Sequence, residues 1–183
     1  MSLTVLSAAL AQNETTTPAQ GTDQRTRSRQ PAILRIARAG TTGTVAVYGA
    51  DLPGKDSASY NKIEAAAAQT VDTDITYAAF SNYNWMVKRN GVILTQDATP
   101  ADLTEFNVTD NGGLARITIG DGTPTLTAGD IIEVFFVTVD TLQAAASTEN
   151  VAAQISCRDV LWAVGSNTGS FSTSVVTVEP LAI

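Results

Sequence analysis

The stretch that decides the fold is NYNWMVKRNGVILTQ, residues 82–96, in which Asn90-Gly91 separates two runs of strand-forming residues. An Asn-Gly pair in this setting predicts a β-hairpin, because both central residues of a type I′ turn need a positive φ. Three more runs follow, separated by Gly-rich turns: LTEFNV at 103–108, LARITI at 114–119 and IIEVFFVTV at 131–139. This succession predicts a β-meander, and with it an all-β protein.

The rest of the chain has the same character. Short strand-like runs are AILRIARA at 32–39, TVAVYGADL at 44–52, ITYAAFS at 75–81, ISCRDVLWAV at 155–164 and SFSTSVVTV at 170–178. Strands of this length, with turn residues between them, are typical of antiparallel sandwiches and barrels. We therefore expect an antiparallel β-sandwich or barrel of about nine strands, preceded by an extended N-terminal arm.

Individual runs predict their places in the sheets. Residues 131–139 are apolar on both faces apart from Glu133, so this strand should be buried on both faces and lie centrally. SFSTSVVTV is half polar, which is typical of an edge strand that awaits a partner. KIEAAAA at 62–68 fits a short helix or an extended segment, and the small polar residues 143–154 indicate a connection that could hold a helical turn.

Composition narrows the function classes. A chain of 183 residues suits one domain, or one domain with an arm. It contains no histidine, the commonest general base and the commonest transition-metal ligand. The single cysteine, Cys157, excludes an internal disulfide and is best explained as a small buried apolar residue.

The N-terminal region differs from the rest. Residues 12–31, QNETTTPAQGTDQRTRSRQP, contain almost no large apolar side chains and cannot bury enough surface to fold alone. We expect an extended arm at 1–31 and a β-sandwich domain at 32–183. The run LTVLSAALA at 3–11 is similar to a short leader, but it is preceded by no positive charge, so we expect it in the mature chain. No other run approaches the roughly 18 apolar residues of a membrane span.

Charge is divided unevenly along the chain. Residues 1–40 carry a net charge of +3 and the remaining residues a net charge of −10. A basic arm on an acidic body suits docking onto a second copy, although a solvated tail would have the same composition. The low overall pI of about 4.4 and the lack of interleaved aromatic residues disfavour nucleic acid as a partner. The assembly contacts that we expect are Leu3, Val5 and Leu6 in an apolar groove and Arg25, Arg27 and Arg29 on an acidic surface.

A search for catalytic and metal-binding patterns finds none that is complete. There is no nucleophile elbow, phosphate loop or dinucleotide fingerprint. Asp72, Asp74 and Asp121 lack the spaced oxygen ligands of a calcium loop and are best explained as turn caps. Glu105 and Glu133 could form a glycosidase-like pair only if the fold brought them together. We expect no catalytic, cofactor-binding or metal-binding residue, no cofactor and no small-molecule substrate.

Aromatic residues offer one alternative. A sugar-binding face could be lined by Trp85, Tyr83, Tyr77 and Tyr60. Because aromatic residues make up only 6% of the chain, the core and rim of a sandwich account for these four better than a sugar-binding face does.

One region resembles a known class of protein. W-x-V-x-x-N-G-V at 85–92, DLTEFNVTDNGGLARITIG at 102–120 and L-x-A-G-D-x-I-E-V at 126–134 look like a β-module of tailed-bacteriophage virion proteins. Such modules occur in tail, fibre, neck and head-decoration components, and similar meanders occur in bacterial adhesins. The resemblance covers residues 83–139 and rests mostly on turn residues. The chain lacks the coiled coil and the repeats of a fibre tip, which favours a decoration, neck or tail component.

Three functions therefore remain. The resemblance implies a non-enzymatic virion structural protein, made in the bacterial host cytoplasm, that forms a homo-oligomer and contacts other virion proteins. The alternative is a β-sandwich module that binds carbohydrate or a host surface, such as a tail-fibre or adhesin domain. The third, a carboxylate-dependent hydrolase, is the least consistent with a chain that lacks histidine.

Overall fold

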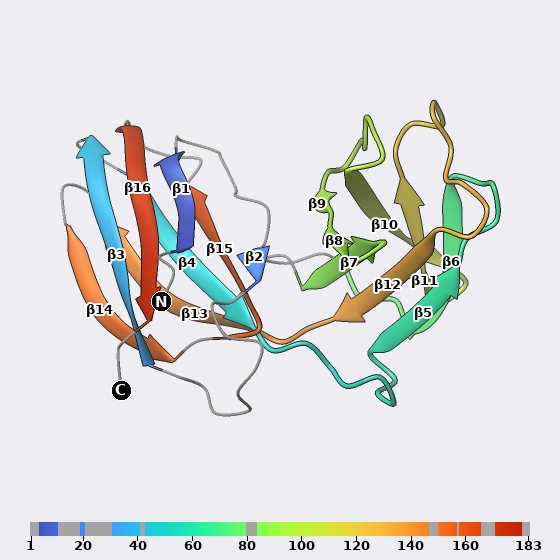
Figure 1. The fold of residues 1–183 in the computed structure, drawn as a ribbon, viewed down its shortest axis with the longest axis horizontal. Coiled ribbons are helices and arrows are strands. Elements are labelled where there is room, and N and C mark those ends of the chain that lie inside the picture. Colours follow the sequence, from blue (N-terminus) through green and yellow to red (C-terminus); the bar gives the residue numbers. More distant parts are fainter. Residues whose placement is uncertain are drawn as a thin grey trace. The chain divides into compact units, whose positions relative to one another are not determined.

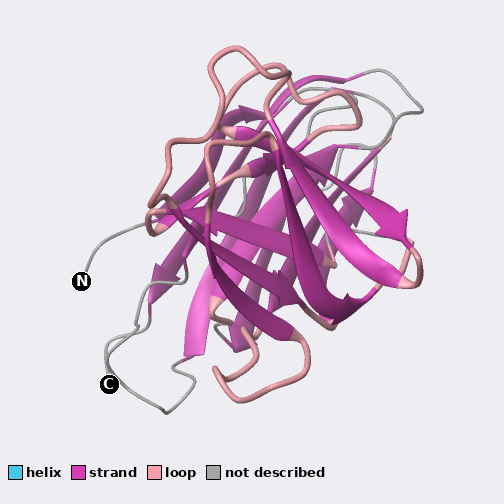
Figure 2. Ribbon diagram, turned by 90° about the vertical axis from the view of Figure 1, so that its right-hand side faces the viewer, coloured by secondary structure: helices cyan, strands magenta, loops and turns pink. Residues whose placement is uncertain are grey.

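The computed structural model describes residues 4–10, 19–20, 31–40, 43–79, 84–146, 150–156, 158–165 and 171–180. These residues form strands and loops and no helix (Figure 2), which confirms the expected all-β, antiparallel sandwich class. No helix of the described chain is therefore long and apolar enough to cross a membrane. The described part contains sixteen strands, so the expected number of about nine was wrong.

The chain divides into two compact units. Unit 1 comprises Met1–Asp51 and Asp140–Ile183, and unit 2 comprises Leu52–Val139, inserted between the two parts of unit 1. The sequence suggested a different division, with an arm at 1–31 and one sandwich after it. The alternating pattern of strands could not show the difference, because it continues without a break from one unit into the other.

Unit 1 consists of two four-stranded sheets (Figure 1). Sheet 1 has the order β1 (Thr4–Leu10), β16 (Phe171–Pro180), β3 (Pro31–Gly40) and β14 (Val151–Ser156). Sheet 2 has the order β13 (Val139–Ala146), β4 (Thr44–Ala50), β15 (Val160–Gly165) and β2 (Ala19–Gln20). The core of unit 1 takes apolar side chains from both sheets, including Leu34, Ile36, Val47, Leu161 and Val176.

Unit 2 also consists of two four-stranded sheets. Sheet 3 has the order β5 (Tyr60–Glu64), β12 (Ile131–Phe136), β7 (Trp85–Arg89) and β8 (Val92–Ile93). Sheet 4 has the order β6 (Thr70–Thr76), β11 (Leu114–Ile119), β10 (Glu105–Asn111) and β9 (Thr95–Gln96). A separate core fills unit 2, with Trp85, Phe106, Ile117, Ile132 and Val134 among its buried members.

Several sequence predictions for unit 2 are confirmed. Asn90 and Gly91 have φ values of 50° and 82°, as a type I′ turn requires, and β7 pairs with β8 across them. β12 lies between β5 and β7, the central position expected from its apolar faces. Residues 62–68 are not helical, and the extended alternative holds only for 62–64, which lie in β5, whereas 65–68 form a loop.

Other predictions were wrong. SFSTSVVTV was expected at an edge, but β16 lies between β1 and β3, because the N-terminal residues supply the neighbouring strand. Residues 143–154 were expected to form a connection, but they fall largely in β13 and β14, where small residues occupy an edge strand of each sheet. Two long runs are also divided: 131–139 at Val137 and 92–96 at Leu94, which accounts for part of the higher strand number.

A carboxylate holds the turns of unit 2 together. Asp130 accepts hydrogen bonds from Asn90 Nδ2 at 2.7 Å, from Arg89 Nε at 2.9 Å and from the Thr127 amide at 3.0 Å. Asn90 Oδ1 in turn accepts from the Ile131 amide at 2.9 Å. The hydrogen bond from Asn90, with those from Arg89 and Thr127, holds the pKa of Asp130 below its usual value, although burial opposes this. The Asn-Gly turn and the Ala-Gly-Asp turn are therefore one structure.

Asp130→Asn should destabilise unit 2 selectively. Because its pKa is lower in the folded state, Asp130 stabilises that state fully above its unfolded pKa of about 3.9, and the contribution is lost as the pH falls through the lower folded value. At neutral pH we expect a loss of about 1–3 kcal/mol in the free energy of unfolding, because the buried Asp130 side chain loses its charge and one of the two oxygens that accept from its three donors.

The measurement is urea unfolding followed by fluorescence from pH 3 to 7, in two single-tryptophan versions of the chain. The chain has one tryptophan in the core of each unit, Trp85 in unit 2 and Trp162 in unit 1. The transition reported by Trp85 should shift, with a difference from wild type that shrinks below about pH 4. Exposed Asp56→Asn serves as the control. Equal shifts for both tryptophans would show that the two cores do not unfold separately.

Candidate functional site

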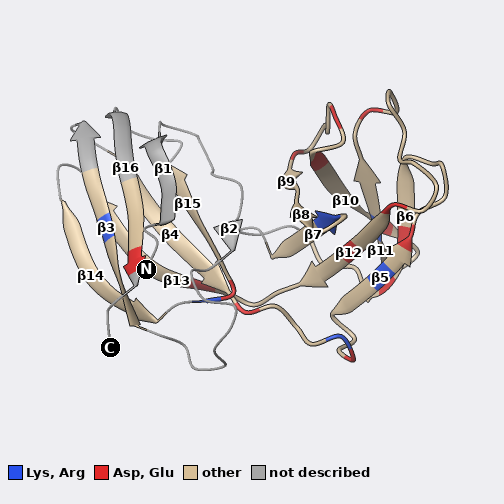
Figure 3. Cartoon of the chain, viewed as in Figure 1, with Lys and Arg blue, Asp and Glu red and all other residues tan. Residues whose placement is uncertain are grey.

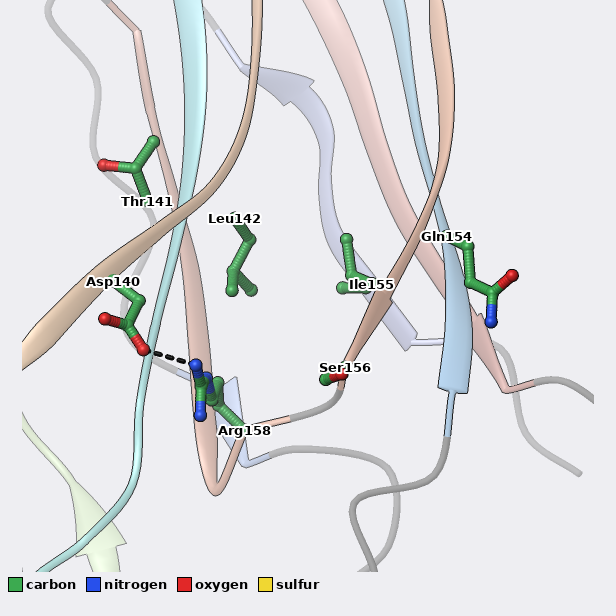
Figure 4. A pocket seen from close by; sticks show the side chains of 7 residues that line it. All are labelled: Asp140, Thr141, Leu142, Gln154, Ile155, Ser156 and Arg158. Atoms are coloured by element: carbon green, nitrogen blue, oxygen red, sulfur yellow. Dashed lines mark ion pairs between the residues drawn. The ribbon is translucent and has the colours of Figure 1, made fainter.

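A hollow lies on one side of unit 1, between the edge strands of its two sheets. It has a volume of about 410 Å³ and is lined by Asp140, Thr141 and Leu142 of β13, by Gln154, Ile155 and Ser156 of β14, and by Arg158. Leu142 and Ile155 lie between the two strands and the polar side chains surround them (Figure 4). The hollow exists because β13 ends sheet 2 and β14 ends sheet 1, so no further described strand closes the sandwich there.

Arg158 holds two carboxylates at one end of the hollow. Its Nη1 lies 3.1 Å from Asp51 Oδ2 and its Nη2 lies 2.5 Å from Asp140 Oδ2 (Figure 4). The arginine side chain is only 17% exposed, whereas those of Asp51 and Asp140 are 37% and 46% exposed. Arg158 Nε is buried and has no hydrogen-bond partner among the described residues. The two ion pairs therefore compensate for burying a guanidinium that is not fully satisfied.

The backbone of β4 makes room for this arginine. A Cβ at Gly49 would lie 2.7 Å from Arg158 Cγ and 2.9 Å from Leu142 Cδ1, closer than real contacts. Only glycine at this position allows Arg158 and Leu142 to pack over the strand.

The ion pairs connect the two places where the chain passes between the units. Asp51 is the last residue of unit 1 before unit 2 begins, and Asp140 is the first residue after it ends. Arg158 comes from the loop before β15 and joins both. Sequence reasoning missed these three residues, because Asp51 and Arg158 are 107 positions apart and nothing local marks them as partners.

The expected assembly residues are only partly described. Leu3, Arg25, Arg27 and Arg29 lie outside the described residues. Val5 and Leu6 belong to β1, which pairs antiparallel with β16 of the same chain, with Val5 opposite Thr177. Of the six residues, the structure therefore describes only two, both on an N-terminal strand that completes a sheet of its own unit.

The acidic candidates are separated from one another. Glu105 accepts from the Ala101 amide in sheet 4, while Glu133 accepts from Tyr60 in sheet 3, and the core of unit 2 separates the inner faces of the two sheets. Asp121 caps its turn through the Thr123 amide, as expected. Asp72 and Asp74 lie on strand β6 instead of in a turn, and Asp72 pairs with Arg116. The described residues contain no group of three that could hold a metal ion.

The three described members of the aromatic set, Tyr60, Tyr77 and Trp85, do not form a shared face. Trp85 is fully buried and donates from Nε1 to the Ala78 carbonyl, and Tyr77 is partly buried against the same core. Tyr83 lies outside the described residues. Tyr60 contacts a charged side chain: its hydroxyl donates to Glu133 Oε1 at 2.9 Å. Burial, followed by the hydrogen bond to Glu133 and the charge of Glu133, raises the pKa of Tyr60 to about 12, so this phenol remains a donor at neutral pH.

Charge is concentrated in unit 2. Residues 52–139 contain eleven acidic and five basic residues, and the acidic residues lie on both strands and loops of this unit (Figure 3). Most basic residues of the chain outside this range precede residue 40. Unit 2 therefore carries a net charge of −6, which is part of the −10 that the sequence assigns to residues 41–183.

Comparison of the chain with models of protein families, with curated proteins and with solved structures found no match in any of the three.

Replacing Arg158 should destabilise unit 1. Arg158→Gln removes the cation that Asp51 and Asp140 share, and we expect a loss of about 1–2 kcal/mol in the free energy of unfolding, kept low because both carboxylates are partly exposed. Arg158→Lys retains the charge but lacks the planar fork that reaches both carboxylates. Its free energy of unfolding should therefore lie between those of wild type and Arg158→Gln. Urea unfolding reported by Trp162 is the measurement. A glutamine variant as stable as wild type would show that the paired carboxylates contribute nothing.

Proposed function

We propose that this chain is a non-enzymatic structural component of a tailed-phage virion, a decoration, neck or tail protein, that assembles through its N-terminal segment and its strand edges. The resemblance to phage modules at residues 83–139 supports this, and that region lies wholly within unit 2. Its partners would be further copies of the chain and other virion proteins, after synthesis in the bacterial host cytoplasm.

The observation that carries the assembly proposal is the pairing of β1 with β16. The N-terminal residues of the chain form an outer strand of sheet 1, so this segment can complete a sheet. An outer strand that is joined to its domain by a long polar segment can take the same place on a neighbouring copy at little cost, because the contacts are unchanged. In the proposed assembly, β1 of each copy lies on β16 of the next.

The basic residues would then direct the exchange. Arg25, Arg27 and Arg29 follow β2 in the sequence, and the acidic surface of unit 2 offers carboxylates to them. Exposed ion pairs contribute only about 0.2–1 kcal/mol each, so strand pairing and the apolar side chains of Leu3, Val5 and Leu6 would supply most of the affinity.

A carbohydrate-binding function would need a surface other than the one expected from the sequence. Trp85, the largest of the four aromatic residues considered for it, is inside the core. The Trp85→Ala variant would therefore report on folding and could not serve as a clean test of sugar binding.

A disulfide between β1 and β16 tests the exchange. Val5→Cys and Thr177→Cys, in a Cys157→Ser background, place two cysteines at directly opposite positions of an antiparallel pair. Oxidation should give chains linked to one another on a non-reducing gel. Disulfides formed only within single chains would overturn the exchange, and the single-cysteine variants are the controls.

Charge reversal of Arg25, Arg27 and Arg29 tests the electrostatic part. Light scattering should give a defined oligomer for the full chain and a lower mass for the triple Glu variant at low ionic strength. The triple Lys variant keeps the charge and should keep the mass. Salt screens exposed charges, so the difference should shrink near 1 M salt, where the Debye length is only about 3 Å. An unchanged mass for the Glu variant at low salt would contradict this part of the proposal.

A further inference from the structure

β14 differs from the other edge strands of the molecule. Natural sheets protect their edges with very short strands, charged residues, prolines or bulges. Among the described edges, β2, β8 and β9 are two residues long, and β5, β6 and β13 carry charged side chains. The pairing of β1 is irregular at two places. β14 has none of these protections.

The sequence of β14, VAAQIS, contains no charge, no glycine and no proline. It pairs with β3 through six successive residues without a bulge, and no described strand pairs with its other side (Figure 1). Ala152, Gln154 and Ser156 are exposed on the outer face, while Ile155 is buried and Val151 packs partly against the core of unit 1. Its free backbone edge is therefore regular and uncharged.

The hollow described above lies beside this edge. Leu142 and Ile155 form its apolar part, and it opens between β13 and β14. A strand added to β14 would extend sheet 1 across this side of unit 1. It would cover Leu142 and Ile155, beside which no further described strand lies.

We infer that the edge of β14 is an interface at which a second copy of this chain pairs antiparallel, β14 against β14. The lack of charge on β14 identifies the occupant, because a charged segment from another protein would find no counter-charge on this strand. The same strand of a second copy is matched in length, polarity and face, and it pairs with itself about a two-fold axis. The inference rests on the proposed function only in that both require the chain to assemble.

The faces of the strand determine the register. A one-residue slip would turn the core-facing side chains outward, so residues of like face must be opposite each other. Among the registers that keep like faces opposite, only the one with Ala153 on the two-fold axis brings Val151 opposite the partner's Ile155, so that the larger apolar side chains of both copies pair on the core face. Ala152 is then opposite the partner's Gln154 on the outer face. The two copies of sheet 1 would join into one continuous sheet.

Two double variants of the full chain, matched in position, test this register. Ala152→Lys with Gln154→Lys brings lysine opposite lysine twice across the axis, and like charges that are directly opposite destabilise a strand pair. Ala152→Lys with Gln154→Glu brings opposite charges together at the same two places. Both positions are exposed in the single chain, so each variant should fold, which circular dichroism and tryptophan fluorescence will check.

Light scattering at low ionic strength should give the wild-type mass for the Lys/Glu variant and about a twofold lower mass for the Lys/Lys variant, since one two-fold contact is lost. Equal masses for wild type and Lys/Lys, equal losses in both variants, or a monomeric wild type at high concentration would each overturn the inference.

The arm variants separate the two proposals. A Lys/Lys variant that keeps its mass while arginine reversal lowers it rejects the β14 interface alone. A Lys/Lys variant that loses mass while the arginine reversal keeps it rejects the role of the arm alone.

Discussion

The structure depends on one constraint: the chain must leave unit 1 and return to it at neighbouring positions. β4 and β13 are adjacent in sheet 2, so the residues that precede and follow unit 2 start from adjacent strands. Unit 2 meets the same requirement, because its first long strand, β5, pairs with its last, β12. The Phe136 amide also donates to the Ser59 carbonyl at 2.9 Å, just beyond that pairing. An insertion whose two ends lie close together disturbs its host least.

Arg158 strengthens this arrangement at Asp51 and Asp140, where the chain leaves unit 1 and returns to it. Two carboxylates would otherwise approach each other where the chain passes out of and into unit 1, and the guanidinium offers each of them a separate nitrogen. The cost is a buried Nε that has no hydrogen-bond partner in the described part of the chain, and a position in β4, Gly49, where a Cβ would clash with Arg158 and Leu142. Asp51 follows the end of β4, Asp140 lies at the start of β13 and Arg158 lies in a loop. The two ion pairs add side-chain contacts that hold these chain segments together, beside the hydrogen bonds of the sheet.

Local turn chemistry could be predicted from the sequence, whereas the assignment of strands to sheets could not. The positive φ at Asn90 and the central place of β12 follow from residues within a few positions of each other. The division into two sandwiches depends on pairings such as β4 with β15 and β3 with β16, whose partners are more than a hundred residues apart. The prediction that β16 lies at an edge was wrong for the same reason. β1, which pairs with it, belongs to a segment whose composition predicts an arm. The candidate site was missed because Asp51, Asp140 and Arg158 are ordinary charged residues until the fold places them together.

The way unit 2 is joined to unit 1 also bears on how such a chain can be rebuilt. A turn of a few residues between the end of β4 and the start of β13 would restore an unbroken hairpin and leave the order of sheet 2 unchanged. Conversely, any host with two adjacent strand ends could receive unit 2 as a cassette, because β5 and β12 already present its two termini side by side. Recombination at these two points would exchange one complete hydrophobic core for another, and the acidic outer surface would move with it as a single heritable module.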